Sequence, residues 1–562
     1  MRATLFALTI GFSAAAQEPP DLRTRAESSD YVDTSTYDDV LRVAKGVVGS
    51  SALARFEIFG KSEEGRELPL LILSEPAVET PEAARKLGRP IVFIQANIHA
   101  GEVEGKEAAL ILARRLTSGD LRSLLKQLVI LIAPIYNADG NEKVNVINRT
   151  AQNGPVGGVG TRENAKGLDL NRDYMKLDSA EARALVGLMN RWDPHVAIDL
   201  HTTNGSYHGY HLTYSPTLNS NADPRLIALA RDRILPTVQQ AVLKKHSFQT
   251  YFYGNFASES GIARENARVD PANPGDTIWR TFDHRPRFGN NYVGLRNRLA
   301  ILSEAYSYLD FRGRVRVTEV FVEESLRAVA ANAARLTALT AQLDAEAQGM
   351  AAGTTSRGRN GTMTVRPAFG VEFKMIALEA PVEILVGDVE KVRNPQSGRE
   401  MLAMSPTSVP VKMKDYGLFE ATRTVVMPGG WLIPRPHVES GRYAQAIDRL
   451  RWHGLRVQTI AEDAELDVER FVVGALTKAE RVFQGHNEAK LSGKYERAKL
   501  SAQRGGLFIP ANQRLARLAF YLLEPESDDG LVTWNLIEEG LTPGGTYPVY
   551  RIMNAGTLKL SN

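Results

Sequence analysis

The feature that most constrains the fold is a series of short apolar runs that alternate with segments of helical periodicity. The apolar runs lie at residues 90–97, 128–134, 195–200 and 299–302. Helical periodicity is found at residues 105–116, 179–191 and 314–343. Short continuous apolar runs are typical of strands that are buried on both faces. The alternation therefore predicts an α/β domain with a mixed, mainly parallel sheet sandwiched by helices.

The chain has 562 residues, which is too long for one hydrophobic core and predicts more than one domain. We expect a signal peptide at residues 1–16, the α/β domain at 17–348, a flexible glycine-rich linker at 349–362 and an accessory domain at 363–562. Short strand patterns follow the linker, so the C-terminal domain is predicted to be a β-rich α+β domain. Residues 203–298 are predicted to be loops and short elements over the functional edge of the sheet.

The first residues have the pattern of a secretory signal peptide. Arg2 precedes an apolar stretch at residues 3–14, and alanines at 14–16 suit cleavage near Ala16. This predicts a periplasmic or secreted protein, with a disordered start or a short anchor as the alternative. No later run approaches the roughly 18 apolar residues of a membrane span. A net charge of +3 over the whole length does not indicate a nucleic-acid partner.

The chain has no cysteine, so any metal must be held by histidine and carboxylate side chains. His99 and Glu102 follow the apolar run at 90–97, and His201 ends the run at 195–200. Ends of strands are where α/β sheets place their sites, and this set suits Zn²⁺ with a position left for water. Taken singly, each motif is also compatible with a polar strand-end residue satisfied by the backbone.

Two further motifs carry a candidate carboxylate-binding pair and a candidate general base. Asn171 and Arg172 follow Asp169, and an arginine fork beside an amide donor can hold a carboxylate. Glu304 closes the apolar run at 299–302, where a carboxylate suits a general base. The alternatives are an exposed loop with ordinary surface charges and a solvated strand-end glutamate.

Together the four motifs resemble the carboxypeptidase A-like zinc metallocarboxypeptidases, in which they occur in this order. The resemblance covers about residues 35–345 and implies the fold of that family and one Zn²⁺. It implies that His99, Glu102 and His201 are the zinc ligands, and that Asp169 orients the first histidine ligand.

The resemblance also implies roles on the substrate side. Asn171 and Arg172 match the residues that grip the terminal carboxylate of the substrate, and Glu304 matches the catalytic base. Arg162 is the candidate for the arginine that polarises the scissile carbonyl, and Arg149 is its rival.

The sequence departs from the family pattern where the substrate would be covered. Phe282 stands at the distance at which these enzymes carry a mobile capping tyrosine. Tyr292 lies nearby and is either a substitute that binds substrate or a core tyrosine. Arg296 and Arg298 precede the catalytic strand and would favour an acidic C-terminal residue if one of them pointed inward; surface arginines are the alternative.

The resemblance thus predicts an exported zinc carboxypeptidase that acts on peptides with a free C-terminal carboxylate. One alternative is an amidase of the same fold that cleaves peptidoglycan stem peptides. A second is a non-catalytic zinc- or peptide-binding protein in which the C-terminal domain supplies the function. The oligomeric state stays open.

Overall fold

The computed structural model describes residues 21–203, 205–259, 268–352, 354–358, 361–554, 556 and 558–561. The predicted signal peptide at residues 1–16 lies outside these ranges. Within them, no helix is both long and apolar enough to cross a membrane.

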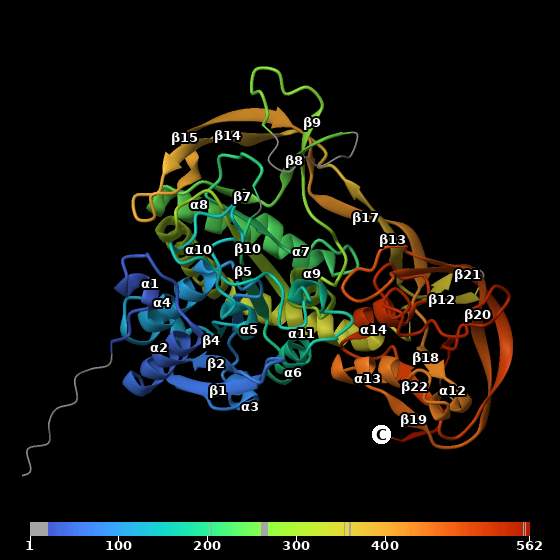
Figure 1. Cartoon of the computed structure of the whole chain (residues 1–562). Helices are drawn as coiled ribbons and strands as arrows, with labels where there is room; N and C mark the ends of the chain where they lie inside the picture. Colours follow the sequence, from blue (N-terminus) through green and yellow to red (C-terminus); the bar gives the residue numbers. More distant parts are fainter. Residues whose placement is uncertain are drawn as a thin grey trace, which may run out of the picture.

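An eight-stranded sheet forms the centre of the N-terminal part (Figure 1). Its strand order is β1-β2-β4-β3-β5-β10-β6-β7. The strands are β1 (Ala54–Lys61), β2 (Glu67–Leu73), β3 (Ile91–Ala96), β4 (Val129–Ala133), β5 (Val196–Thr202), β6 (Leu212–Ser215), β7 (Thr250–Phe252) and β10 (Leu299–Ala305). The central strands β4, β3, β5 and β10 run parallel. The pairs β1–β2, β2–β4 and β10–β6 are antiparallel, and β7 pairs in parallel with β6 at the edge. The predicted mixed, mainly parallel sheet is therefore confirmed.

Helices cover both faces of this sheet. Gly105 of α4 (Glu104–Ser118) lies so close to Leu200 that an added Cβ would meet its side chain, so this glycine lets α4 pack tightly on that face. Helices α2 (Tyr37–Ser50), α10 (Phe311–Ala331) and α8 (Leu235–His246) extend the same layer. On the other face, Ala197 and Asp199 lie with residues of α6 (Ala180–Trp192) and α9 (Gly289–Leu295). Alternate residues of β5 thus face opposite layers.

The smaller elements of this part connect the strands or extend the helices. They are α1 (Arg25–Ser28), α3 (Pro81–Lys86), the 3₁₀ turns at Arg122–Lys126 and Leu170–Arg172, α5 (Ala138–Asn141) and α11 (Ala333–Gly349). The helix predicted at 314–343 is two helices, α10 and α11, that meet at Asn332.

The prediction of loops and short elements for residues 203–298 is wrong in one place. Helix α7 (Pro224–Ala228), a π-helical turn (Leu229–Ile234) and α8 form one continuous helical segment. Asp223 caps its start, and its buried side chains recur with helical spacing at Leu226, Leu229, Ala230, Ile234, Leu235, Val238 and Val242. This periodicity was present in the sequence. The short strands β8 (Asn255–Ser258) and β9 (Thr277–Arg280) complete the segment.

The C-terminal region is rich in strands. A seven-stranded sheet has the order β21-β20-β23-β18-β22-β19-β24. Its strands are β18 (Gly430–Ile433), β19 (Gln458–Ile460), β20 (Ala464–Lys478), β21 (Ala489–Ala502), β22 (Leu507–Pro510), β23 (Tyr550–Ile552) and β24 (Leu560–Ser561). The region also contains α12 (Arg435–Glu439), α13 (Ala444–Trp452) and α14 (Ala516–Leu523), and side chains of α13 and α14 share a buried apolar cluster with residues of the sheet. The region is α+β in composition, as expected from the sequence.

Two long hairpin-like pairs join this sheet to the rest of the chain. Strand β13 (Ala368–Ile376) pairs with β17 (Leu418–Val426), and β14 (Val382–Arg393) pairs with β15 (Glu400–Met413). At the residues predicted as a linker, β11 (Thr354–Gly358) pairs with β12 (Gly361–Val365), which continues past the predicted boundary at 362. The short β16 (Asp415–Tyr416) adds to β9 of the N-terminal part. In Figure 1 the β14–β15 pair arches over the N-terminal part, far from the seven-stranded sheet.

The C-terminal region shares a core with the N-terminal part. Helices α13 and α14 contact α6 and α9, and one cluster of buried apolar side chains runs from the central sheet to Trp431 and Phe520. Polar contacts cross the same boundary: the Tyr292 hydroxyl lies 2.9 Å from Nδ1 of the fully buried His453. The accessory region therefore packs against α6 and α9, which cover one face of the central sheet.

Candidate active site

The carboxyl ends of three adjacent parallel strands bring the predicted metal ligands together. His99 and Glu102 lie in the turn between β3 and α4, where the Glu102 amide donates to the His99 carbonyl. His201 lies near the end of β5, and Glu304 of β10 is its direct neighbour in the sheet register. Because β3, β5 and β10 are consecutive in the sheet, residues distant in sequence meet at one edge.

His99, Glu102 and His201 form a buried cluster whose ligand atoms all lie within 4.8 Å of one another. The Nδ1 atoms of the two histidines are 3.2 Å apart. His99 Nδ1 lies 3.0 Å from Glu102 Oε1, and His201 Nδ1 lies 3.0 Å from Glu102 Oε2. Burial opposes ionisation of Glu102, but His99 and Arg149 hold the pKa of that carboxyl well below its usual range. The cluster therefore keeps a negative charge at its centre.

Two aspartates orient the imidazole rings of His99 and His201. His99 Nε2 lies 3.0 Å from Asp169 Oδ1, and His201 Nε2 lies 2.9 Å from Asp199 Oδ2. A carboxylate at Nε2 favours the tautomer that carries its proton there, which leaves an unprotonated Nδ1 on each ring. The two Nδ1 atoms and the Glu102 carboxylate point at one another, and each Nδ1 can offer a lone pair once its ring is neutral. Such a donor set fits Zn²⁺.

Glu304 lies beside this cluster and lines a cavity of about 270 Å³ with the three clustered residues. The cavity is also lined by Arg162, Asn171, Arg172, Thr202, Tyr253, Phe282, Asp283, Phe288 and Leu302. Burial raises the pKa of the Glu304 carboxyl to about 8; the nearby His201 opposes this shift and Glu102 adds to it. Glu304 can thus exchange a proton near neutral pH.

Asn171 and Arg172 form the opposite wall. Asn171 Oδ1 accepts a hydrogen bond from the Gly289 amide at 3.0 Å, which leaves its NH₂ group to donate elsewhere. The Arg172 guanidinium packs on the Phe288 ring at 3.9 Å from the ring centroid. Among the described residues, the carboxylate that Arg172 reaches is Asp169, at 3.9 Å. Arg172 is therefore held in place by stacking, with its charge incompletely neutralised.

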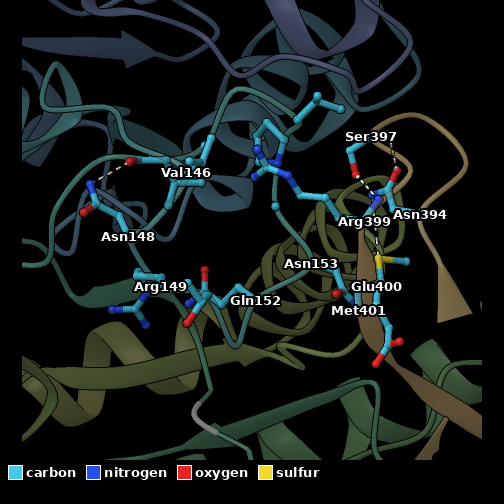
Figure 2. A pocket seen from close by; sticks show the side chains of 16 residues that line it. Val146, Asn148, Arg149, Gln152, Asn153, Asn394, Ser397, Arg399, Glu400 and Met401 are labelled. Atoms are coloured by element: carbon cyan, nitrogen blue, oxygen red, sulfur yellow. Dashed lines mark hydrogen bonds between the residues drawn. The ribbon is translucent and has the colours of Figure 1, made fainter. Parts of the chain in front are cut away.

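Arg162 and Arg149 both touch the metal-ligand cluster, from different sides. Arg162 Nε donates to Asp169 Oδ2 at 3.0 Å, and the side chain lines the cavity that contains Glu304. Arg149 Nη2 lies 2.7 Å from Glu102 Oε1 and lines a second cavity of about 230 Å³. Figure 2 shows this second cavity between the 146–159 segment and residues 394–401 at the β14–β15 turn. Arg162, not Arg149, thus faces Glu304.

Three other predicted side chains lie elsewhere. Tyr292 is fully buried and does not line the cavity; its hydroxyl is taken by His453. Arg296 donates to Asn190 at 2.9 Å, and Arg298 pairs with Asp193 and Asp344, each at 2.7 Å. The structure therefore places Tyr292 in the core, and neither arginine forms an acidic-residue pocket.

The sequence reasoning missed two residues of the site. Asp199, which orients His201, lies two positions before it on the same face of β5, and this alternation was a usable signal. Tyr253 lines the cavity, and its ring contacts Phe282 at 5.4 Å between centroids. Burial, with the nearby Glu304 charge, raises the pKa of Tyr253, so its hydroxyl remains a donor. Its place in a loop after β7 gave no sequence signal.

A neighbouring cavity of about 570 Å³ shares Phe282 and Asp283 with the cavity that contains Glu304. The C-terminal region contributes Met375, Phe419 and Asp528 to its wall. The surroundings of the site are thus built by both parts of the chain.

A buried cluster of two histidines and a glutamate, with a further glutamate in the same cavity, suits a metal-dependent hydrolase built on an α/β sheet. Residues 47–259 match the family model of zinc carboxypeptidases, so this part of the chain is a zinc carboxypeptidase domain. The resemblance predicted from the sequence is confirmed.

Curated relatives agree with this family. Carboxypeptidase 2 of Trichophyton rubrum is 24% identical over 521 residues, which are 90% of this chain and 84% of that protein. Mouse carboxypeptidase D is 34% identical over 146 residues, 23% of this chain and 10% of that protein. Among solved structures, the Pseudomonas aeruginosa metallo-carboxypeptidase is 17% identical with a TM-score of 0.37, covering 55% of this chain and 71% of that one. Carboxypeptidase A of Helicoverpa armigera is also 17% identical, with a TM-score of 0.39 and coverages of 54% and 75%.

Proposed function

We propose that this zinc carboxypeptidase removes residues from peptides that end in a free carboxylate, with one Zn²⁺ held by His99, Glu102 and His201. The observation that carries the proposal is that Arg172, stacked and incompletely neutralised, shares a cavity with Glu304 and the ligand cluster. A fixed cation on one side of the reacting groups selects substrates whose terminal carboxylate lies next to the scissile bond.

Zn²⁺ bound there would supply a Lewis acid that lowers the pKa of a water molecule and polarises the scissile carbonyl. Asp169 and Asp199 hold the two imidazole rings in the orientation that this requires. Glu304 takes the proton of the attacking water and passes it to the leaving amine. Its buried position and raised pKa support a proton carrier that works near neutral pH.

Arg162 is the group that stabilises the negative charge developing on the carbonyl oxygen. Asp169 fixes its Nε, while its Nη1 lies 3.3 Å from His99 Nδ1, which supports a position beside the reacting carbonyl. On the other wall, the Arg172 fork and the free NH₂ of Asn171 hold the terminal carboxylate. Tyr253 faces the same space and takes the part proposed from sequence for Tyr292.

The experiment is mass spectrometry of paired peptides, each with a free and an amidated C-terminus, incubated with the zinc-loaded protein. We expect stepwise shortening of the free peptides alone. Arg172→Ala should raise KM for the free peptides by about 100-fold, because a charge-assisted bidentate pair is lost. Arg335→Ala, at an exposed position on α11, is the matched control and should leave KM unchanged.

Other outcomes would contradict the proposal. Equal shortening of amidated peptides would remove Arg172 from carboxylate selection. Cleavage confined to muropeptides would favour the cell-wall amidase. Zinc binding without any cleavage would favour the non-catalytic binding protein.

We also propose that the chain is exported, because residues 2–16 have the charged, apolar and small-residue pattern of a signal peptide. Terminal sequencing of the protein recovered from the periplasm or medium tests this. A new amino terminus near residue 17 is expected, and an intact Met1 in a cytosolic protein would contradict it.

A further inference from the structure

The segment that carries Asp169, Asn171 and Arg172 is held from outside by the C-terminal region. Residues 169–178 run along the face covered by that region and make five hydrogen bonds or ion pairs to it, one of them from Arg449 Nη2 to Asp178 Oδ1 at 3.0 Å. The other four reach different groups of the segment. These four are the Asp169 amide to Gln484 Oε1 at 2.7 Å, His453 Nε2 to the Met175 carbonyl at 3.0 Å, Arg449 Nε to the Lys176 carbonyl at 3.0 Å, and His486 Nε2 to Asp178 Oδ2 at 2.8 Å. Gln484 is the member of this set that reaches the site itself.

Gln484 lies at the tip of a two-residue turn in the connection between β20 and β21. Phe483 and His486 exchange both backbone hydrogen bonds, at 2.8 and 3.0 Å, and the two residues between them have φ values of 52° and 81°. Positive φ at both central positions is the pattern of a type I′ turn. Gly485 suits this conformation, whereas a residue with a Cβ, such as Gln484, is disfavoured in it. A disfavoured residue at a turn tip is a candidate for function.

Aromatic and ionic contacts hold this turn in place. The Phe483 ring stacks on Trp534 with centroids 6.4 Å apart, and the Arg287 guanidinium lies 4.4 Å from the Trp534 ring centroid. Arg287 is also paired with Glu488 at 2.5 Å and with Asp529 at 2.8 Å. The side chain of Gln484 is thus presented to Asp169 from a rigid support.

Asp169 is the residue through which a small displacement of the backbone at this position would reach the site. Its carboxylate meets His99 Nε2 at 3.0 Å and Arg162 Nε at 3.0 Å, and it accepts from the Asn171 amide at 2.9 Å. Gln484 Oε1 accepts a hydrogen bond from the Asp169 amide and so fixes the peptide plane that precedes the Asp169 carboxylate. Rotation of that plane would move the start of the turn that carries Asn171 and Arg172.

We propose that Gln484 of the C-terminal region is a positioning residue for the carboxylate-binding wall of the peptidase site. It acts through Asp169, and it makes the accessory region a part of the catalytic apparatus. The proposal rests on the proposed function, because Asn171 and Arg172 are taken to bind the terminal carboxylate of the substrate.

The test uses the full chain with Glu304→Gln, so that binding is measured without turnover. A peptide with a free C-terminus is titrated by calorimetry into this parent and into three further variants. Gln484→Gly removes the acceptor and also relieves the disfavoured φ, so the thermal midpoint should stay equal or rise. Gln484→Glu keeps an acceptor at the same place. Gln503→Ala, an exposed glutamine at the opposite end of the β20–β21 pair, is the matched control.

We expect Gln484→Gly to weaken peptide binding about three- to tenfold, the size of one lost hydrogen bond. Gln484→Glu should recover most of the affinity, and Gln503→Ala should match the parent. In the active chain, Gln484→Gly should raise KM more than it lowers kcat.

Unchanged affinity in Gln484→Gly would overturn the proposal while leaving the proposed function intact. An equal loss in Gln484→Gly and Gln484→Glu would also overturn it, since the acceptor would then have no role. Failure of the parent to prefer free over amidated peptide would overturn the proposed function first, and this inference with it.

Discussion

The metal side and the substrate side of the site are built in different ways. On the metal side, His201 and Glu304 lie near the ends of β5 and β10, and His99 and Glu102 lie in the turn directly after the adjacent β3, so strand order brings them together. On the substrate side, the wall is assembled from turns, a loop after β7 and a contact from the C-terminal region. The first arrangement is set by strand order, and the second depends on packing between distant segments. The predictions below test how independent these two sides are.

The largest effect is expected on the metal side. Glu304→Gln removes the proton acceptor but keeps the shape of the side chain, so kcat should fall by about 10²- to 10⁴-fold. The zinc content, measured by elemental analysis, should stay at one per chain, because Glu304 is not in the ligand cluster. Glu346→Gln, on the surface helix α11, should leave both quantities unchanged. Near-normal turnover in Glu304→Gln would remove this residue from the mechanism.

Much of the metal side could be read from the sequence for a physical reason. An apolar run indicates a buried strand, and the polar residue at its end lies at the carboxyl edge of the sheet, independent of the conformation of the loops. The predicted positions of His99 after a buried strand, and of His201 and Glu304 at the ends of theirs, therefore agree with the structure. The same rule would have found Asp199, because alternate residues of β5 share a face. The continuous helix from Pro224 to His246 was missed although its apolar spacing was visible.

Asp199 gives the next test on the metal side. Asp199→Asn keeps the size of the side chain but weakens the carboxylate that fixes His201 Nε2, so zinc affinity should fall about ten- to 100-fold. Competition with a chelator measures this without any substrate. Asp232→Asn, at an exposed position after α7, is the control. If Asp199→Asn binds zinc as tightly as the parent, the ring of His201 is oriented by the strand alone.

The substrate side could not be read in the same way. From the sequence, Tyr292 is either a substitute for the capping tyrosine that binds substrate or a core tyrosine. In the structure it is buried and its hydroxyl lies against His453 of the C-terminal region. Tyr253 reaches the cavity only because β7 adds to the edge of the sheet and the following loop folds back. No local pattern reports such long-range contacts.

The two tyrosines therefore offer a direct comparison. Tyr253→Phe removes a hydroxyl that faces the cavity, and kcat/KM for a free-terminus peptide should fall about tenfold, the cost of one hydrogen bond to a charged group. Tyr292→Phe should leave kcat/KM within about twofold and lower the free energy of unfolding by about 1 kcal/mol, since a buried hydrogen bond is lost. The reverse pattern in steady-state kinetics would return the substrate role to Tyr292.

The smallest effect concerns the junction that holds the substrate side in place. His453 is buried between the Tyr292 hydroxyl and the Met175 carbonyl, and burial lowers its pKa to about 3. In the unfolded chain its pKa is about 6.5. Between these values the unfolded state binds the extra proton, so the free energy of unfolding falls as the pH falls below about 6.5.

Urea unfolding at pH 7 and pH 6 measures this contribution. His453 alone should lower the free energy of unfolding by about 0.7 kcal/mol over that interval. His453→Gln, which cannot take up the proton, should lose that part of the pH dependence, whereas His246→Gln at the end of α8 should keep it. The structural reason is that a charged imidazole would face the Arg296 and Arg449 guanidinium groups, both of which lower the pKa of His453. An unchanged slope in His453→Gln would mean that the junction opens before this histidine titrates, and that the C-terminal region is held at Tyr292 less tightly than the structure indicates.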